Sequence, residues 1–518
     1  MTKASRNKPK DEQTKSTSTL ALSKSNKQNI SVLESTFKND SDLIIREVST
    51  SLFKNDCSIV YIEGIADSHS VEEFIIKSLT VEKVSHDIQL EDILQIKKYI
   101  SIGYIEILEN IETVQGRLLN GYTVLLVEGF DHCLGIDTKS FKERAIQESE
   151  TEVLVRGPRD SFTEVIRTNT ALIRQRIRSI HLRVISMEIG TTTNTEVSVV
   201  YLDHIAEQDL VDEVMRRLKK IDIDSILESG YIEELIQDKT LTPFPTILNT
   251  ERPDKVAGKL LEGRIAILVN GTPFVLVVPA LFIEFYQVPE DYYQRFDYIS
   301  LLRILRLVAL FLSLLAPSLY IAITTFHHEM LPPTLLVSLY SQREGVPFPA
   351  FVEAIIMEIA FEIIREAGLR MPRAVGQAVS IVGTLVVGLA AVEAGLVSAA
   401  MVIIVAITAI SSFVIPTFSM SISFRMLRFP MMLLSATFGL YGIAVGCLII
   451  LLHLCSLRSF GIPYMSPIAP FNLQDQKDSI LRLPIWMMNK RPKLLNHDNK
   501  MRTSSNSNTQ KMGGNSDE

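Results

Sequence analysis

Two kinds of hydrophobic pattern divide this chain. Up to about residue 295, short apolar runs rich in β-branched residues alternate with amphipathic stretches. The amphipathic stretches, Glu207–Ile221 and the region from Ile30 to Val48, predict helices. The short runs predict strands, and such an alternation is typical of an α/β or α+β fold. We expect strands at Cys57–Ile62, Tyr122–Glu128, Val197–Leu202 and Arg264–Val269.

Beyond residue 295 the chain carries apolar runs long enough to cross a bilayer. Ile304–Phe326 has one charge in 23 residues and Met431–Cys455 has none in 25, whereas a spanning helix needs about 20 apolar residues. Between them, Val375–Val392 and Gly395–Ile415 lie so close together that a hairpin in or near the membrane is predicted. A soluble core could account for one such run but hardly for four. The sequence therefore predicts an all-α polytopic membrane domain after a mixed N-terminal region.

Polar ends and one charged stretch set the expected boundaries. The ends are poor in large apolar residues and predict disordered tails at 1–30 and 493–518. The charged stretch Lys139–Glu152 predicts two cytoplasmic subdomains, 31–145 and 146–295. A membrane domain with four to five helices is expected over 296–456, followed by a cytoplasmic segment over 457–492. Asn270–Gly271 predicts a two-residue turn between two apolar strands, the second of which ends at Pro279.

Charge and cysteine content narrow the function classes. The formal net charge of −7 is spread along the chain without a basic face, so we expect no nucleic-acid partner. The four cysteines form no CxxC pair and are interpreted as small buried hydrophobic residues. The loop Phe326–Pro349 is rich in proline and is predicted to be re-entrant, and its His327-His328-Glu329 run lacks a third spaced ligand. We therefore expect no metal and no cofactor, and no arrangement of residues predicts catalysis.

Three long segments carry a resemblance to a known family. Glu150–Ser179, Thr250–Pro279 and Pro347–Pro372 closely resemble, in this order, the A subunit of the GerA-family spore germination receptors. The resemblance covers roughly residues 30–490. It implies an integral, multi-pass protein of the spore inner membrane whose N-terminal domain is cytoplasmic.

The resemblance also implies partners and a mechanism. The family's A subunit works with a transporter-like B subunit, which binds the nutrient, and a lipoprotein C subunit. It is expected to assemble as a homo-oligomeric ring, a pentamer, that forms a nutrient-gated channel for monovalent cations. Stage V sporulation AF-type paralogues in the same family would differ in partner and trigger but not in fold. A non-conducting signalling scaffold is the alternative, and the absence of an internal repeat argues against a secondary transporter.

The acidic apolar segment Ala350–Gly368 is the candidate pore or gate. At 100° per residue, Glu358, Glu362 and Glu366 share one sector of a helix, and an apolar stripe lies beside them, with Glu353 near the opposite side. Carboxylates facing lipid cost about 2.5–3.5 kcal/mol each, so they should face protein, water or headgroups. The stripe consists of Val352, Ile356, Ile359 and Ile363. Around a ring axis the carboxylates would attract cations and the isoleucines would form a dewetting gate, and both arrangements stay open. In the alternative interpretation the helix lies at the interface, with its glutamates paired to Arg365, Arg370 and Arg373.

Small residues and arginines complete the candidate sites. Small residues spaced every four positions predict close helix packing at Gly376, Ser380, Thr384 and Gly388, and at Gly442 and Gly446 after Gly439. A basic group in the soluble part predicts a subunit contact with glutamates of a neighbouring copy; it comprises Arg156, Arg159, Arg167, Arg174, Arg176 and Arg178.

Basic residues also predict the orientation in the membrane. Arg295, Arg303 and Arg306 precede the first span, which places the N-terminal region in the cytoplasm. Five crossings would leave the basic C-terminal segment outside, against the same rule. We therefore expect one apolar segment to be re-entrant and the C-terminus to be cytoplasmic as well.

Overall fold

The computed structural model describes residues 21–38, 40–50, 55–80, 92–102, 104–139, 149, 152–372, 388–472, 475–492 and 501–502. The chain forms two compact units, one of residues 1–145 and 167–186 and the other of residues 146–166 and 187–518. The predicted tails lie largely outside the described residues. The first helix, however, begins at Asn26, inside the stretch expected to be disordered, where the Asn26 side chain donates to the carbonyl of Asp56 at 3.0 Å.

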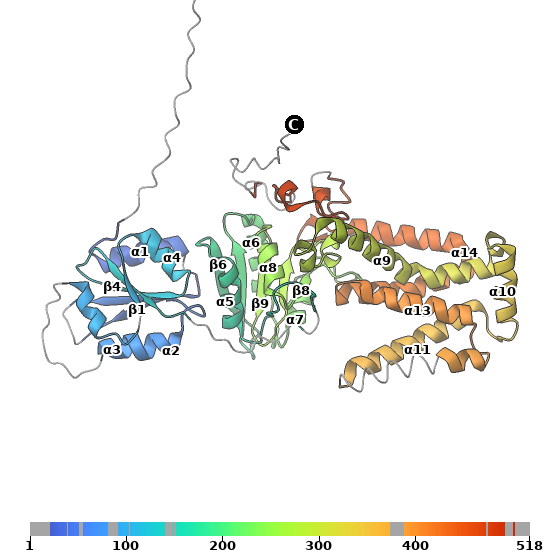
Figure 1. Ribbon diagram of the computed structural model, residues 1–518, viewed down its shortest axis with the longest axis horizontal. Coiled ribbons are helices and arrows are strands. Elements are labelled where there is room, and N and C mark those ends of the chain that lie inside the picture. The colour runs from blue at the N-terminus through green and yellow to red at the C-terminus, as the bar shows by residue number, and fades with distance from the viewer. Residues whose placement is uncertain are drawn as a thin grey trace, which may run out of the picture. The chain divides into compact units, whose positions relative to one another are not determined.

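The first unit is built on a five-stranded antiparallel sheet, and its elements are labelled in Figure 1. The sheet order is β1-β2-β4-β5-β3, with Ile59 of β2 opposite Leu125 of β4. The strands are β1 (Leu43–Val48), β2 (Cys57–Ile62), β3 (Ile105–Leu108), β4 (Tyr122–Val127) and β5 (Cys133–Asp137). The helical elements are α1 (Asn26–Phe37), α2 (Ser68–Ser70), η1 (Val71–Ile76), α3 (Lys77–Thr80), η2 (Ile93–Lys98), α4 (Ile111–Leu118) and α5 (Ile166–Arg176).

Both faces of this sheet are covered, which explains its continuously apolar strands. Ile59 of β2 packs in a cluster with η1 and η2, whereas its neighbour Val60 packs in a second cluster with α1 and α4. The helix expected over Ile30–Val48 is therefore only half correct. It ends at Phe37, where Lys38 takes a left-handed φ of 49°, and Leu43–Val48 pairs with β2 as a strand.

A second sheet has the order β6-β7-β9-β10-β8; β7 to β10 belong to the second unit, and β6 runs across the boundary between residues 186 and 187. Pairing between β7, β9, β10 and β8 is antiparallel, so the N-terminal region is α+β. The strands are β6 (Leu182–Ile189), β7 (Thr195–Leu202), β8 (Leu248–Thr250), β9 (Ile265–Val269) and β10 (Val275–Val278), with helices α6 (Gln208–Lys219), α7 (Ser229–Ile236) and α8 (Pro253–Leu260) and 3-10 turns η3 (Phe282–Phe285) and η4 (Pro289–Tyr292). The turn after β9 lies where expected, with Gly271 at a φ of 92°, but it is longer than two residues because β10 begins only at Val275.

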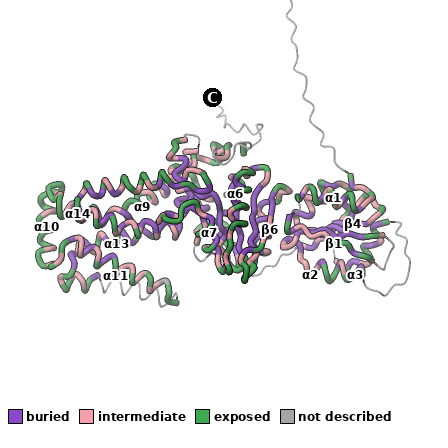
Figure 2. The backbone as a smooth tube through the Cα atoms, turned by 180° about the vertical axis from the view of Figure 1, so that it is seen from behind, coloured by how far each residue is buried: buried purple, intermediate pink, exposed green. Residues whose placement is uncertain are grey.

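A helical region follows in the same unit. Its elements are α9 (Phe296–Thr325), η5 (His328–Met330), α10 (Pro333–Arg343), α11 (Ala350–Arg370), α13 (Ala399–Val414) and α14 (Phe418–Ser456), then β11 (Arg458–Ser459), β12 (Ile462–Pro463), η6 (Asp475–Lys477) and η7 (Ile485–Met487). Figure 1 shows α9, α13 and α14 side by side, with α10 across the end of the bundle. The strands are mostly buried, whereas the long helices expose much of their surface (Figure 2). By length and composition, α9 and α14 are apolar enough to cross a membrane.

Helix α14 is a hairpin. A straight helix of 39 residues would be about 58 Å long. Yet Phe424 near its start and His453 near its end both pack on Phe244, with ring centroids 5.9 and 6.0 Å away. Between them Gly439 leaves helical geometry, at φ 60° and ψ −140°, beside His327. The expectation of one span over Met431–Cys455 is therefore wrong, because the turn lies within that run.

Small residues let the two arms of this hairpin meet. A Cβ added at Gly446 would lie 2.5 Å from the sulfur of Met431, on the other arm. At Gly442 an added Cβ would lie closer to the carbonyl of Leu434 than any side chain tolerates. A Cβ added at Gly388 would lie 3.6 Å from the Val402 side chain, an ordinary van der Waals contact. The other predicted packing positions, Gly376, Ser380 and Thr384, lie outside the described residues.

The hairpin returns the chain to the sheet. Ser459 donates to the carbonyl of Thr246 at 2.7 Å, and Phe282 N–H donates to the carbonyl of Tyr464 at 2.9 Å. Arg482 donates to the carbonyl of Gln294 at 2.8 Å. The segment after α14 therefore lies at the same end of the helices as the sheet.

Candidate functional site

The acidic helix α11 exposes the predicted apolar stripe. Ile356, Ile359 and Ile363 are 41%, 48% and 64% exposed, and Val352 is partly exposed. The opposite side, with Ala354 and Met357, is buried against the rest of the bundle. The stripe is thus available for a contact outside this chain.

Glu353 lies in the first turn of α11 and connects this helix to two others. Its buried carboxylate accepts the backbone N–H of Ser398, the residue before α13, at 2.9 Å. The guanidinium of Arg343, from α10, lies 3.3 Å from its other oxygen. Glu353 therefore joins three helices, a role that periodicity alone did not indicate.

Glu358 forms a buried ion pair with Arg428 of α14. The two side chains are each 1% exposed, and the arginine Nη1 lies 2.5 Å from Oε2 of the carboxylate. Arg428 Nε also donates to the carbonyl of Ser313 on α9 at 2.7 Å. A buried charge is tolerated only when it is paired, so this contact fixes α11 against α9 and α14.

The remaining glutamates lie nearer the sheet-side end of α11. Glu362 pairs with Arg425 of α14 at 2.7 Å, and Glu366 forms an exposed pair with Arg370 at 2.6 Å. An open hollow of about 460 Å³ lies beside them; it is lined by Ile359, Glu362, Ile363, Glu366, Ala367, Arg370 and Phe429. In the interface interpretation the partners were Arg365, Arg370 and Arg373, but the structure supplies Arg428 and Arg425 for the inner two glutamates. Arg373 lies outside the described residues.

The basic group of the soluble part is divided by the fold. Arg174 is buried in the first unit and donates to Asp42 at 2.7 Å and to Asp40 at 3.2 Å, so its side chain serves the interior. Burial raises the pKa of Asp40 to about 6, against the attraction of Arg174 and with a further increase from Asp42. Arg167 pairs with Glu63 at 3.0 Å.

The other members of this group are more accessible. Arg156 and Arg159 are exposed, and Arg178 is exposed with a 2.9 Å hydrogen bond to Asn120. Arg176 is partly buried and donates to the carbonyl of Leu172 at 3.2 Å. A subunit contact at these arginines stays a prediction.

A charged cluster anchors the C-terminal segment at the start of α9. Asp291 is fully buried and lies 2.9 Å from Arg303 and 2.8 Å from Arg306. Arg303 also lies 3.0 Å from Asp478, whose pKa is raised by burial although Arg303 lowers it. This cluster, which sequence reasoning missed, ties η4, α9 and the C-terminal segment together.

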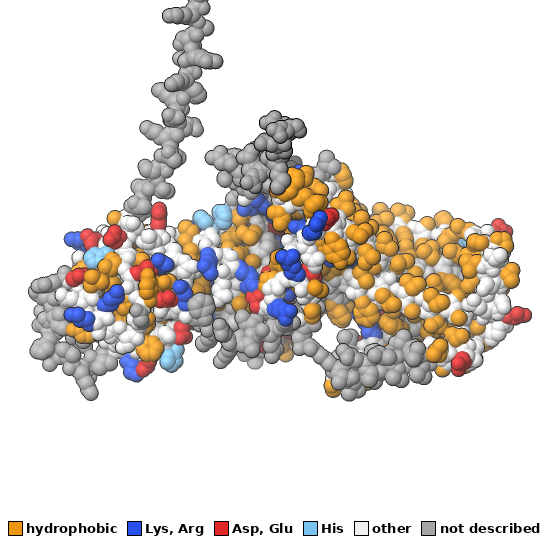
Figure 3. Space-filling model, in the orientation of Figure 1, with side chains coloured by type: hydrophobic (Ala, Val, Ile, Leu, Met, Phe, Trp, Pro, Cys, Tyr) orange, Lys and Arg blue, Asp and Glu red, His pale blue; other side chains and the backbone are white. Residues whose placement is uncertain are grey.

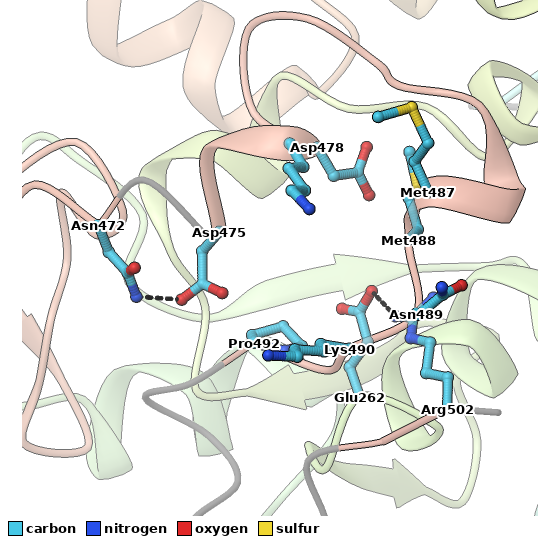
Figure 4. Close-up of a pocket in the computed structure, with 11 residues that line it drawn as sticks. Glu262, Asn472, Asp475, Asp478, Met487, Met488, Asn489, Lys490, Pro492 and Arg502 are labelled. Carbon is cyan, nitrogen blue, oxygen red and sulfur yellow. Dashed lines mark hydrogen bonds and ion pairs between the residues drawn. The ribbon is translucent and has the colours of Figure 1, made fainter. Parts of the chain in front are cut away.

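A cavity of about 640 Å³ lies beside this segment (Figure 4). Its walls carry acidic and basic groups together: Glu262, Asp475, Asp478, Lys477, Lys490 and Arg502. Glu262 pairs with Arg502 at 3.1 Å, and although burial opposes its ionisation, Lys259 and Arg264 hold its pKa at about 2. Since the charges compensate one another, the cavity favours neither a cation nor an anion.

Comparisons with known proteins agree over most of the chain. The family described as Bacillus/Clostridium GerA spore germination protein matches residues 31–494. Spore germination protein KA of Bacillus subtilis is 48% identical over 93% of this chain and 89% of its own length. Spore germination protein GerLA of Bacillus cereus is 39% identical over 88% of this chain and 92% of its own.

Similarity to a solved structure covers the N-terminal half. That structure is the N-terminal domain of the A subunit of the Bacillus megaterium spore germinant receptor GerK3, which is 38% identical with a TM-score of 0.41 and covers 51% of this chain and 98% of that domain. From the family match and the relatives along nearly the full length, the chain belongs to the GerA family of spore germination proteins.

Proposed function

We propose that this chain is the A subunit of a germinant receptor and forms a pentameric, nutrient-gated channel for monovalent cations. A transporter-like B subunit would bind the nutrient, and a lipoprotein C subunit would complete the complex. The partner's state would bias the ring between closed and open forms. The proposal requires no catalytic step.

The observation that carries this proposal is the division of α11 into two faces. Its inner carboxylates are bound by arginines of the same chain, which leaves the isoleucine stripe exposed. In a ring of copies, a rigidly held apolar face at the axis would exclude water and close the pore. Of the two arrangements that the sequence left open, these contacts favour the isoleucine gate, with Glu366 at its sheet-side end.

The proposed topology follows from the hairpin. Because the chain after α14 contacts the sheet, the C-terminal segment lies on the side of the N-terminal region. Arg295, Arg303 and Arg306 near the start of α9 favour the cytoplasm for that side. We therefore propose an integral protein of the spore inner membrane, with residues 296–456 in the membrane and 457–492 returned to the cytoplasm.

The test is cation leak in cells that express the chain with its B and C partners. Ile356→Ala, Ile359→Ala and Ile363→Ala should depolarise the membrane and slow growth without nutrient, because smaller side chains let water and ions pass a dewetted constriction. Ile403→Ala is the matched control, since Ile403 is 59% exposed on α13. Normal membrane potential in all three variants, with normal assembly and nutrient response, would exclude a gate at this face.

A non-conducting signalling scaffold is the second candidate. The buried cluster of Asp291, Arg303 and Asp478 favours it, because that cluster could relay a change in the helices to the sheet without a pore. The oligomeric state distinguishes the two functions. A scaffold needs no closed ring, whereas a channel built from α11 does.

A further inference from the structure

Near the sheet-side half of α11, arginines outnumber the carboxylates they face. Arg365, Arg370, Arg425 and Arg428 come together with Glu358, Glu362 and Glu366. Arg428 pairs with Glu358, Arg425 pairs with Glu362, and Arg370 pairs with Glu366, each within hydrogen-bond distance. One positive charge therefore remains without a carboxylate of its own.

That charge belongs to Arg365. In the described part of the chain no carboxylate oxygen lies within ion-pair distance of it, and its Nη1 is buried without a hydrogen-bond partner. Its guanidinium lies over the rings of Phe413 and Phe418, 5.2 and 6.0 Å from their centroids. Arg425 and Arg428 are near enough to repel it, while Glu362 and Glu366, which are already paired with other arginines, are near enough to attract it. A half-buried guanidinium in this setting gains strongly from an anion.

The surface around Arg365 is apolar and exposed. Phe413, over whose ring the Arg365 guanidinium lies, is 65% exposed, and Ile410, three residues earlier on α13, is also 65% exposed. Hydrophobic side chains cover most of the visible face of these helices, with few charges among them (Figure 3). Exposed apolar surface of this extent is typical of a region that contacts lipid chains.

Arg365 also lies toward the boundary of the helical region. Phe418, one of its two aromatic neighbours, is the first residue of α14. The preceding residue, Thr417, donates to the carbonyl of Phe285, in the turn after the sheet, at 2.9 Å. In a membrane-embedded protein, this end of the bundle lies near the headgroup layer on the side of the sheet.

We propose that Arg365 binds the phosphate of an anionic lipid headgroup in the leaflet on the side of the sheet. A guanidinium offers several donors in the planar geometry that phosphate oxygens accept. Basic pockets between membrane helices on the cytoplasmic side bind such headgroups, and that leaflet carries negative lipids. Free inorganic phosphate shares the chemistry, but only a lipid brings acyl chains that cover the exposed Ile410, Phe413 and Phe418. The site does not depend on whether the chain conducts ions.

The experiment uses the full-length chain in neutral detergent, with bound lipid counted by native mass spectrometry. Short-chain phosphatidylglycerol, short-chain phosphatidylcholine and inorganic phosphate are added in turn. We expect phosphatidylglycerol to bind most tightly. Arg365→Gln should weaken its binding about fivefold, which corresponds to about 1 kcal/mol for one basic group near a membrane surface.

A matched variant distinguishes a specific lipid site at Arg365 from general electrostatic attraction between basic residues and anionic lipid. Arg370→Gln removes the same charge from the same helix, but Arg370 is 79% exposed and already paired with Glu366. We expect it to weaken binding less than twofold, and we expect Arg365→Lys to retain most of the affinity. Equal losses in the Gln variants, or equal retention of the two lipids by the wild type, would overturn the proposal.

Two further outcomes reassign the residue. Inorganic phosphate that displaces the lipid at equal concentration would indicate a soluble anion, and a changed oligomer size in Arg365→Gln with unchanged lipid retention would indicate a contact between copies. If Arg365→Gln does not fold, photolabelling of the wild-type protein still tests the proposal. Photoactivatable phosphatidylglycerol should label the peptide that contains Phe413 and Phe418, and labelling spread evenly over the exposed helices would overturn the proposal.

Discussion

The buried pair of Glu358 and Arg428 makes the sharpest stability prediction. Arg428→Met removes a charge that is 1% exposed, and it also deletes the 2.7 Å hydrogen bond to the carbonyl of Ser313. The carboxylate then remains buried without its partner. Breaking a buried pair in this way costs about 3–5 kcal/mol, because the desolvation of the remaining ion is no longer compensated.

The measurement is thermal unfolding of the full-length chain in detergent. With about 2–4 °C lost per kcal/mol in a cooperative unit of some 200 residues, the melting temperature should fall by roughly 10 °C. Arg370→Met is the control, since its pair with Glu366 is exposed and contributes at most about 1 kcal/mol.

A double variant tests the cause. Glu358→Met combined with Arg428→Met removes both charges and leaves apolar side chains of similar length. It should be more stable than either single variant, because neither ion is left unpaired. If Arg428→Met costs no more than Arg370→Met, or if the two single effects simply add, the reasoning about a paired intramembrane charge is refuted.

Three further outcomes follow from other sites. Gly439→Ala places a Cβ 2.7 Å from His327 at a φ of 60°, so it should destabilise the protein in thermal unfolding by about 2 kcal/mol or more, whereas Gly258→Ala, with open space around it, should be neutral or slightly stabilising. Because burial raises the pKa of Asp40 to about 6, the folded state binds a proton that the unfolded chain has lost; wild-type stability should fall relative to Asp40→Asn as pH rises from about 4 to 6, and a constant difference would contradict this. Asp291→Asn weakens the pairing of buried Arg303 and partly buried Arg306 and should speed proteolysis of the C-terminal segment, whereas Asp297→Asn, which removes an exposed pair, should not.

The hydrophobic pattern was sufficient for several of the soluble elements. The runs at Cys57–Ile62 and Tyr122–Glu128 form β2 and β4, and the stretch Glu207–Ile221 contains α6. The pattern was wrong over Leu43–Val48, where helical spacing competed with a strand that pairs with β2. The segment Phe326–Pro349, expected to be a loop, contains the helix α10, and its re-entrant path stays a prediction. At Leu43–Val48 the pairing with β2 outweighed local preference. At α10 the local signal was misread, because Pro333 stands at the first helical position, where proline is tolerated.

The sequence predicted the faces of the candidate helix α11 but not the partners of its glutamates. Periodicity placed the isoleucine stripe and the glutamates on different sectors of one helix, because the angle between residues is fixed by helix geometry. It could not identify Arg428 and Arg425 as partners, since they lie 70 and 63 positions away on α14. Nor could periodicity show that the apolar run Met431–Cys455 contains a turn and is not a single span. The only sign of that turn in the sequence is one glycine, Gly439.

By itself the sequence determined the division into a mixed soluble region and an apolar helical region, the family, and the faces of α11. These depend on composition and on local repeat geometry. Only the tertiary structure decided which face is covered, which arginine neutralises which carboxylate, and on which side the C-terminal segment lies. Those outcomes depend on long-range pairing, since a buried charge is stable only where the folded chain brings its counter-ion within a few ångströms.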